Sequence, residues 1–474
     1  MSLSKELESI FIAQWSQEAL LCENKSFSYG GLYCAASGVA NWIAAQGIES
    51  GDRVALQLPN SPQFAIAYLA CIIGGYSFTP INIELSEAEQ TYILNRICPK
   101  LVIADAGLLD TVPANDCKLP SFPEGVEELE AIFFTSGTTG KPKGVRHNLR
   151  CLFGNAQAFN KTVGLNATTR MYHVLPMSYM AGFLNTLLCP WAAGGVAILG
   201  PRFTPATALN FWCQPIDQKA NTIWLTPTIA AVLVRMSRDP AIAEQVGKQF
   251  KHIFCGTAPL TSHIREGFLK TFQAPLQESY GMSEVLFVSV QMRDEATRSA
   301  NVGRLLEEIS LTHEAAEDLH TKELVIHTPW KLVDYLLEHE QVLLPFNDKG
   351  GMPTGDIGEL IDDRLKITGR IKDLIIRGGV NVSPIAIEEV LSKFEQVKDV
   401  AVIGTPDKVW GEAITACVVP NADLGRDKLQ NALRGHCKEH LAVSMRPDHY
   451  IWLDELPRSN TGKVLKLQLR EEFQ

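Results

Sequence analysis

The sequence predicts an α/β fold, in which helices cover a mostly parallel sheet, and it predicts more than one domain. From residue 26 to about residue 119, segments with helical apolar spacing alternate with short apolar runs, which is the pattern of consecutive strand–helix–strand units. The chain has 474 residues, which is too long for one ordinary hydrophobic core. Two or three domains are therefore expected.

The composition is that of a globular enzyme. Hydrophobic residues make up 46% of the chain, and the formal net charge is −10. No basic stripe stands out against this acidic background, which argues against a nucleic-acid partner. The most apolar run, residues 64–75, is far shorter than the ~20 residues that a membrane-spanning helix needs. We therefore expect no membrane span, and we expect local cations and backbone dipoles to hold any anionic substrate.

The cysteines and the first residues both favour a cytoplasmic protein. Eleven cysteines are scattered among apolar neighbours and form no C-x-x-C pair, which is typical of reduced, buried thiols. Residues 1–8 carry acidic side chains and lack the apolar region of a secretory signal. The sequence does not define the oligomeric state.

The first predicted elements begin the sheet. Residues 32–46 have helical apolar spacing, and a turn separates them from a strand at 53–58. A buried helix at 62–73 and a short strand at 101–104 follow. The apolar run 131–134 predicts a further buried strand.

The stretch after that strand, residues 135–145, is dense in groups that bind phosphate. It holds three glycines, four hydroxyl side chains and two lysines. Glycines let successive backbone N–H groups turn inward, and such donors suit a polyphosphate better than they suit a mobile basic surface loop. The pattern is not a Walker loop, because only two residues separate Gly137 from Gly140 and Pro142 follows Lys141. The predicted phosphate-binding residues are Thr135, Ser136, Gly137, Thr138, Thr139, Gly140, Lys141 and Lys143.

Helices and strands continue to alternate through the middle of the chain. Helices are predicted at 147–160 and 229–236, and strands at 222–226 and 250–255. The last strand ends in the turn Gly256-Thr257-Ala258-Pro259. Because such sheets bind ligands at the carboxyl ends of their strands, this turn is a candidate part of a site.

The motif Glu278-Ser-Tyr-Gly-Met-Ser-Glu284 offers three groups that suit a nucleotide. Tyr280 presents a flat face for a base, Ser283 presents a hydroxyl for a phosphate, and Glu284 presents a carboxylate for Mg²⁺. A magnesium ion on a triphosphate typically uses one or two carboxylates together with phosphate oxygens. A surface turn with a solvated acid is the simpler alternative for Tyr-Gly alone, but not in this context.

An aspartate and an arginine mark the ends of two further strands. Thr354-Gly-Asp356 precedes a strand at 357–360, and Thr368-Gly-Arg370 closes the next one. The two oxygens of a carboxylate match the spacing of vicinal hydroxyls, so Asp356 suits a ribose diol. Arg370 can reach the same ribose or a phosphate.

The remaining segments include one that is irregular. Between residues 304 and 348 a strand is predicted at 323–328 and a helix at 330–339, and no chemistry is assigned to this part. After residue 384 the sequence predicts helices at 385–394 and 426–440 and strands at 400–404 and 416–419, enough for a small domain of roughly a hundred residues. The final motif is Pro457-Arg-Ser-Asn-Thr-Gly-Lys463.

Taken together, the motifs at 135–145, 278–284, 354–356 and 457–463 resemble those of the adenylate-forming superfamily, which includes acyl-CoA synthetases, aryl-CoA ligases, luciferases and peptide-synthetase adenylation domains. The chain is most similar to a compact acyl-CoA ligase. The resemblance implies a large N-terminal domain, residues 1–370, of doubly wound α/β subdomains plus a small β-rich subdomain. It also implies a mobile α+β C-terminal domain, residues 371–474, with a hinge near Lys372.

The resemblance also assigns roles within the site. Lys463 is the implied catalytic lysine, with Ser283 and Glu284 as further catalytic groups and Glu284 as the metal ligand. The implied nucleotide-binding residues, beyond the phosphate loop, are Gly256, Thr257, Ala258, Tyr280, Gly281, Asp356, Arg370 and Lys372.

An acyl pocket is implied around Tyr179, Phe183, Gly281, Met282, Val285 and Leu286. Tyr179 stands where relatives often carry histidine, and Gly281 stands where acetate-specific relatives carry tryptophan. Amino-acid-activating relatives carry an aspartate near Tyr179, whereas residues 171–200 contain no acidic side chain. We therefore expect an apolar aliphatic or aromatic carboxylic acid as substrate.

The implied reaction is ATP-dependent ligation of an acid to a thiol. The carboxylate attacks the α-phosphate of ATP with Mg²⁺ present, pyrophosphate leaves, and coenzyme A then takes the acyl group from acyl-AMP after the small domain rotates. Two alternatives remain open at this point. The chain could load the phosphopantetheine of a separate carrier protein, or it could be an inactive nucleotide-binding homologue.

Overall fold

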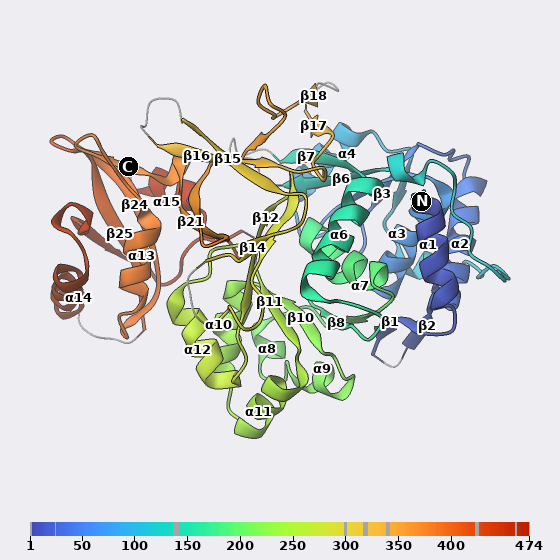
Figure 1. Cartoon of the computed structure of the whole chain (residues 1–474), viewed down its shortest axis with the longest axis horizontal. Coiled ribbons are helices and arrows are strands. Elements are labelled where there is room, and N and C mark those ends of the chain that lie inside the picture. The colour runs from blue at the N-terminus through green and yellow to red at the C-terminus, as the bar shows by residue number, and fades with distance from the viewer. Residues whose placement is uncertain are drawn as a thin grey trace.

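The computed structural model describes residues 2–23, 25–135, 142–297, 301–315, 321–337, 342–421, 426–459 and 462–473. The fold is mixed α/β, with a large N-terminal part and a smaller C-terminal part, and the predicted fold class is thus confirmed. Figure 1 shows β24, β25, α13 and α14 of the C-terminal part gathered at one end of the molecule, and the N-terminal helices α1 and α2 at the other.

The first large sheet is parallel at its centre and antiparallel at both edges. Its order is β14-β13-β12-β11-β10-β8-β9-β1-β2. The strands β1, β9, β8, β10, β11 and β12 run parallel to their neighbours, whereas β2, β13 and β14 pair antiparallel. The bounds are β1 Glu18–Cys22, β2 Lys25–Ser28, β8 Arg170–His173, β9 Val196–Leu199, β10 Thr222–Leu225, β11 His252–Cys255, β12 Gln277–Met282, β13 Leu286–Val290 and β14 Arg304–Leu305.

The second large sheet has the order β18-β17-β7-β6-β4-β3-β5. Its parallel strands are β3, β4, β5 and β6, and β7, β17 and β18 extend it antiparallel. The bounds are β3 Arg53–Leu56, β4 Ser77–Pro80, β5 Leu101–Ile103, β6 Glu130–Thr135, β7 Lys143–Asn148, β17 Asp334–Leu336 and β18 Val342–Leu343. The strands predicted at 53–58, 101–104 and 131–134 all lie here.

Helices cover both sheets, and side chains from both sheets join one continuous apolar core. The predicted helix at 62–73 is α3, and it is buried along almost its whole length, with Ser61 capping its first turn. The helices of this part are α1 Leu3–Ala13, α2 Tyr29–Ala45, α3 Pro62–Gly74, α4 Glu87–Ile97, α5 Ala106–Asp110, α6 Leu149–Val163, α7 Cys189–Ala192, α8 Pro205–Ala208, α9 Cys213–Asp217, α10 Pro227–Met236, α11 Pro240–Gln249 and α12 Ser262–Phe272. A π-helix, Ala181–Leu188, precedes α7.

Two small antiparallel sheets lie between the large sheets and the C-terminal part. One has the order β15-β16-β19, and the other is the hairpin β20-β21. The bounds are β15 Ser310–Ala315, β16 Lys322–His327, β19 Met352–Pro353, β20 Asp356–Ile361 and β21 Arg364–Arg370. Residues 323–328 were predicted as a strand and largely coincide with β16.

The helix predicted at 330–339 is wrong for residues 330–337, the part of this segment that the structure describes. Within this segment Asp334–Leu336 forms the strand β17, which pairs with β7. Three consecutive side chains, those of Asp334, Tyr335 and Leu336, are buried in β17, so both faces of the strand are buried. A short apolar run of this kind does not distinguish a helix from a strand by spacing, and the free edge of β7 selects the strand.

The C-terminal part has a core of its own, built from side chains between Ile375 and Leu441. Its sheet has the order β23-β22-β25-β24, and β26 pairs with β25. The bounds are β22 Ile375–Arg377, β23 Val380–Val382, β24 Val397–Asp407, β25 Gly411–Pro420, β26 His449–Trp452, α13 Pro384–Ser392, α14 Arg426–His440 and α15 Lys466–Glu472. The domain limits 1–370 and 371–474 stay a prediction, although separate apolar clusters lie on either side of that boundary.

No helix in the described ranges is both long enough and apolar enough to cross a membrane.

Candidate active site

A buried carboxylate lies at the centre of the candidate site. Asp356 begins β20, Arg370 ends β21, and the two residues face each other in the register of the hairpin. The Nε of Arg370 donates to Oδ1 of Asp356 at 2.5 Å, and the Tyr280 hydroxyl donates to Oδ2 at 2.6 Å. Burial, with Asp356 nearby, raises the pKa of Tyr280, which therefore stays a hydrogen-bond donor. The predicted residues Tyr280, Asp356 and Arg370 thus meet.

The turn between β12 and β13 presents Ser283 and Glu284. The Nε2 of His147 lies 2.6 Å from the carbonyl oxygen of Ser283, so Nε2 carries the proton and donates. The Tyr335 hydroxyl donates to Oε1 of Glu284 at 2.6 Å, and the backbone N–H of Leu332 donates to the Glu284 carbonyl at 2.7 Å. Three contacts from β7 and from the segment 330–337 therefore hold this turn.

His147 is fully buried, and burial lowers the pKa of its ring to about 4. The ring is therefore neutral at physiological pH, with one N–H for Ser283. The sequence reasoning did not single out His147 or Tyr335. An imidazole directly after the phosphate loop, in a strand whose Val145 is also buried, was the available signal for His147. No comparable signal existed for Tyr335, because the pairing of β17 with β7 is not visible in the sequence.

The phosphate loop is described only at its two ends. Ser136, Gly137, Thr138, Thr139, Gly140 and Lys141 lie outside the described residues. Thr135 ends β6 and Lys143 begins β7, and the two are paired across the antiparallel ladder. The Nζ of Lys143 lies 5.3 Å from the centre of the Tyr335 ring. The ends of the loop are therefore beside Glu284.

The turn Gly256-Thr257-Ala258 follows β11 and lies against β12. A Cβ at Gly256 would lie 3.1 Å from the carbonyl oxygen of Ser279, and Thr257 has a left-handed backbone with φ of 73°. A non-glycine residue in this region carries strain, which is common at ligand sites. The turn therefore lies next to β12, the strand that carries Tyr280.

The six predicted pocket residues divide into two groups. Tyr179, Gly281 and Met282 are partly or fully exposed, and the Tyr179 hydroxyl accepts a hydrogen bond of 3.0 Å from Nδ2 of Asn82. Phe183, Val285 and Leu286 are buried in the core instead. The Phe183 ring, for example, packs against Tyr68 with 4.6 Å between ring centres. Only the first group is therefore accessible to a ligand in this structure.

The backbone around position 281 requires a glycine. A Cβ at this position would lie 2.2 Å from the carbonyl oxygen of Leu286 on the neighbouring strand. The ladder between β12 and β13 shifts register between Tyr280 and Gly281, which brings the two backbones together. A side chain at position 281 would therefore displace backbone atoms.

Lys463 reaches this site from the far end of the chain. The preceding residue, Gly462, accepts a hydrogen bond of 3.3 Å from the Thr228 hydroxyl at the start of α10. Burial and the positive charges of Arg370 and Lys372 together lower the pKa of the Lys463 ammonium to about 8. Asp356 opposes this effect, so Lys463 lies in the electrostatic field of Asp356 and Arg370. Lys372 itself lies in the short turn Ile371–Asp373, directly after Arg370.

A buried ion pair supports the strand that carries Tyr280. Arg265 Nη2 donates to Oε2 of Glu278 at 2.6 Å, and both side chains are buried. Burial raises the pKa of Glu278 to about 7, against the opposing effect of Arg265. The pair lies in the interior, so it supports the site and does not offer a ligand-binding group.

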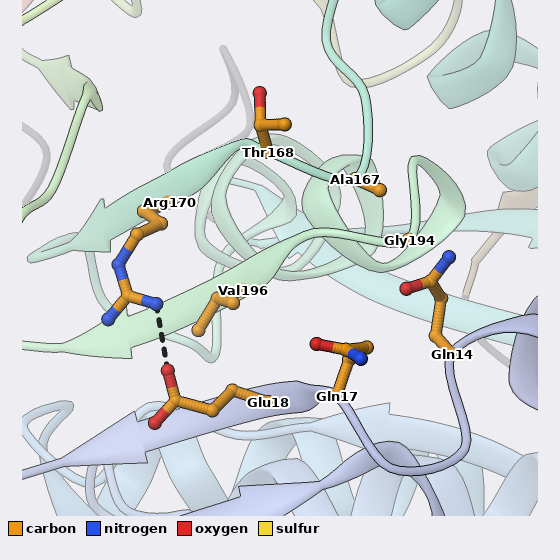
Figure 2. A pocket seen from close by; sticks show the side chains of 8 residues that line it. All are labelled: Gln14, Gln17, Glu18, Ala167, Thr168, Arg170, Gly194 and Val196. Atoms are coloured by element: carbon orange, nitrogen blue, oxygen red, sulfur yellow. Dashed lines mark hydrogen bonds and ion pairs between the residues drawn. The ribbon is translucent and has the colours of Figure 1, made fainter.

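A separate pocket lies at the amino ends of β1, β8 and β9 (Figure 2). It is lined by Gln14, Gln17, Glu18, Ala167, Thr168, Arg170, Gly194 and Val196, and an ion pair of 2.8 Å joins Arg170 to Glu18. Parallel sheets bind their ligands at the carboxyl ends of the strands, which is the opposite edge. None of the predicted site residues lines this pocket, so we do not assign the reaction to it.

Comparisons with known proteins agree with this geometry. The family model for AMP-binding enzymes matches residues 13–330, and the model for the C-terminal domain of AMP-binding enzymes matches residues 386–463. The long-chain-fatty-acid–CoA ligase FadD13 of Mycobacterium tuberculosis is 30% identical over 484 residues, which cover 94% of this chain and 93% of the relative.

Solved structures cover the whole chain. The ATP-bound structure of MatB from Rhodopseudomonas palustris is 25% identical and has a TM-score of 0.87, with 100% of this chain and 99% of that chain covered. The structure of the same protein without ligand is also 25% identical, with 99% of both chains covered, and has a TM-score of 0.78. Over its whole length the chain is therefore more similar to the ATP-bound structure than to the structure without ligand.

Proposed function

Because this chain belongs to the AMP-binding enzyme family, as an AMP-forming acid–CoA ligase that uses ATP, Mg²⁺ and coenzyme A, we propose that the cluster around Asp356, Glu284 and Lys463 is its adenylation site. The observation that carries this proposal is the position of Lys463. It comes from the C-terminal part, yet its pKa responds to Arg370 and Asp356 of the N-terminal part. This electrostatic effect supports a site to which both parts of the chain contribute.

Asp356 is proposed to bind the ribose of ATP. Its Oδ1 already accepts a hydrogen bond from Nε of Arg370, and its Oδ2 accepts one from the Tyr280 hydroxyl and a longer one, of 3.5 Å, from Nη2 of Arg370. A carboxylate has about four lone-pair sites, so the Asp356 carboxylate can still accept a ribose hydroxyl. The existing bonds fix the carboxylate plane, and Asp356 is therefore oriented before the nucleotide arrives.

Lys463 is proposed to stabilise the attack of the acid on the α-phosphate. Two anions must approach each other in this step, and an ammonium group between them offsets their repulsion. A lysine is suited to this role, because its charge is compact and can approach both groups. Positioning and charge stabilisation dominate phosphoryl chemistry of this kind, since the protein can offer little covalent help.

Glu284 is proposed to be the protein ligand of Mg²⁺, and the donor set fits that ion. The described residues contain no group of three or more His, Cys, Asp or Glu side chains that could hold a metal by themselves. Magnesium bound to a nucleotide commonly takes one or two carboxylates and completes its shell with phosphate oxygens and water. When bound, the ion supplies positive charge beside the leaving pyrophosphate. The end of the phosphate loop at Lys143 lies near Glu284, because the Nζ of Lys143 lies over the ring of Tyr335 and the hydroxyl of that ring contacts Glu284.

The second half-reaction is proposed to follow rotation of the C-terminal domain about Lys372. Two of the polar contacts between the two parts are long, with 3.3 Å from Thr228 to Gly462 and 3.3 Å from Ser262 to Glu389, so these two can separate at small cost. A shorter contact, of 2.6 Å from the Ser383 hydroxyl to the Thr368 carbonyl, lies close to Lys372 in the sequence. Coenzyme A supplies its own thiol, and no cysteine of the enzyme is needed. Burial raises the pKa of Cys255, the cysteine next to the turn at Gly256, which keeps this thiol unreactive.

The acid is proposed to be apolar, either aliphatic or aromatic. The exposed candidates Tyr179, Gly281 and Met282 carry no charge, and residues 171–200 provide no acidic group for an amino substrate. FadD13 is a ligase for long-chain fatty acids by name, which is compatible with an apolar acid but does not choose between a chain and a ring.

Pyrophosphate release, measured with a panel of carboxylic acids, tests this assignment. Lys463→Ala should lower the rate with the preferred acid by at least ~100-fold, as expected for the loss of a few kcal/mol of transition-state stabilisation. An unchanged rate in this variant would remove Lys463 from the mechanism. A wild-type protein that releases no pyrophosphate with any acid would favour an inactive nucleotide-binding homologue.

The thiol acceptor needs a separate assay. With the preferred acid, coenzyme A should accept the acyl group, and purified carrier proteins with phosphopantetheine should not. Faster transfer to a carrier protein would favour the alternative, a stand-alone enzyme that loads carrier proteins.

A further inference from the structure

The carboxylate of Glu284 is held by a residue from a different part of the chain. The Tyr335 hydroxyl donates to Oε1 of Glu284 at 2.6 Å, and the two residues are 51 positions apart. Among the described residues, no hydrogen bond reaches the other oxygen, Oε2. One oxygen is therefore engaged by the protein, and the other is available to a ligand.

Tyr335 is itself rigidly placed. It lies in β17, opposite Val145 of β7, and only 7% of its surface is exposed. The preceding residue, Asp334, is buried and accepts two hydrogen bonds from the guanidinium of Arg146, one of 2.9 Å from Nε and one from Nη2. The backbone N–H of Val333 also donates to the Arg146 carbonyl at 2.7 Å. A buried, forked ion pair of this kind fixes the strand in register.

The backbone of the Glu284 turn is held by the same two segments. Leu332, three residues before Tyr335, donates to the Glu284 carbonyl, and His147 of β7 donates to the Ser283 carbonyl. The main chain and the side chain of Glu284 are therefore both fixed from β7 and from the segment 330–337. This segment is the part of the chain to which the sequence assigned no chemistry.

The ring of Tyr335 makes a second contact toward the site. Lys143, at the end of the phosphate loop, places its Nζ 5.3 Å from the ring centre, within the range of a cation–π contact. The tyrosine thus touches the proposed metal ligand with its hydroxyl and the phosphate-loop lysine with its ring. Burial and the charge of Glu284 raise the pKa of Tyr335, so the hydroxyl keeps its proton.

We propose that Tyr335 is a positioning residue for the metal site, which orients the Glu284 carboxylate so that Oε2 is directed to the Mg²⁺ of bound ATP. This inference rests on the proposed role of Glu284. A free glutamate side chain samples many rotamers, and that freedom is lost when it binds an ion. With Oε1 already fixed by Tyr335, less freedom remains to be lost, and the ion binds more tightly.

Tyr335→Phe tests the proposal, because it removes the hydroxyl and keeps the ring over Lys143. Mn²⁺ serves as the metal probe, added to the enzyme in the presence of α,β-methylene-ATP, and the free Mn²⁺ signal is followed by electron paramagnetic resonance. The apparent Kd for Mn²⁺ should rise about tenfold, which is the lower range for loss of one hydrogen bond to a charged group. The affinity for AMP, measured without metal, should change less than twofold.

Three further variants make the result specific. Tyr33→Phe removes a hydroxyl that donates to the Ser121 carbonyl at 2.7 Å, away from the site, and should leave both affinities unchanged. Tyr335→Leu also removes the ring below Lys143, so it should weaken metal-free binding of α,β-methylene-ATP as well. Glu284→Gln should weaken Mn²⁺ binding more than Tyr335→Phe does.

Two results would overturn the positioning role. The first is an unchanged Mn²⁺ affinity in Tyr335→Phe. The second is an equal loss of AMP and Mn²⁺ affinity in that variant, because Tyr335 would then support the fold alone. If Glu284→Gln binds Mn²⁺ as well as the wild type does, the proposed role of Glu284 fails instead, and this failure is distinguishable from the other two.

Discussion

At the scale of single residues, the surroundings of Lys463 disfavour the positive charge that its proposed role requires. The proposed chemistry needs an ammonium group near the α-phosphate, whereas burial and the cations Arg370 and Lys372 favour the neutral amine. Since its pKa is lowered to about 8, the group is mostly charged at pH 7 and loses its charge as the pH rises through 8. This titration lies in a range that kinetics can reach.

We therefore predict that adenylation loses efficiency above pH 8. The value of kcat/KM for pyrophosphate release should fall about tenfold between pH 7 and pH 9, since this parameter reports groups of the free enzyme. Lys463→Arg should be slower at every pH but should lack this decline, because a guanidinium stays charged throughout the range. An identical decline in Lys463→Arg would assign the titration to another group.

The residues of the candidate site differ in how well the sequence predicts them. Asp356, Arg370 and Tyr280 belong to motifs at strand ends, and the structure brings them within hydrogen-bond distance of one another. His147 and Tyr335 act through partners 136 and 51 positions away, so their contacts depend on which strands become neighbours. A local pattern carries no information on such a pairing.

At the scale of elements, the parallel strands were the most predictable part. They are short runs of buried apolar residues bounded by turns, and this pattern has few alternatives once helices separate the runs. The prediction of a helix at 330–339 was wrong because β17 forms only by pairing with the free edge of β7. The π-helix Ala181–Leu188 was not predicted, since the same apolar residues suit an α-helix equally and tertiary packing selects between the two.

Helix α14 carries one glycine that the fold does not require. Gly435 lies on the exposed face of the helix, and a Cβ there would meet no atom within 4 Å. We predict that Gly435→Ala stabilises α14 by about 1 kcal/mol, because glycine is the poorer helix former by that amount. Hydrogen exchange of the amides of α14 measures this change directly.

The same substitution at Gly411 is the matched control. Gly411 lies at the tip of the β24–β25 hairpin with φ of 78°, a conformation that costs other residues about 1 kcal/mol or more. Gly411→Ala should therefore destabilise the C-terminal domain. Effects of equal sign at the two positions would mean that backbone conformation does not decide the outcome.

At the scale of the whole molecule, the proposed site requires the two parts to be docked against each other. One contact between the two parts is made at the start of helix α12. The N-cap residue of this helix, Thr261, makes no side-chain capping bond. Instead, the first helical N–H, that of Ser262, donates to Oε2 of Glu389, which lies on α13 of the C-terminal part, at 3.3 Å. A negative charge at a helix N-terminus is favourable, so this contact stabilises the docked arrangement.

Glu389→Gln should therefore weaken docking and slow only the step that needs it. A charge at a helix N-terminus contributes about 0.3–1 kcal/mol, so pyrophosphate release should fall about two- to fivefold. Thioester formation from synthetic acyl-adenylate and coenzyme A should keep its rate, because the proposed second step begins after the contact has opened. Glu395→Gln, an exposed glutamate of the same domain, serves as the control and should change neither rate. Equal slowing of both half-reactions in Glu389→Gln would show that Glu389 supports the fold of its domain and does not select the docked state.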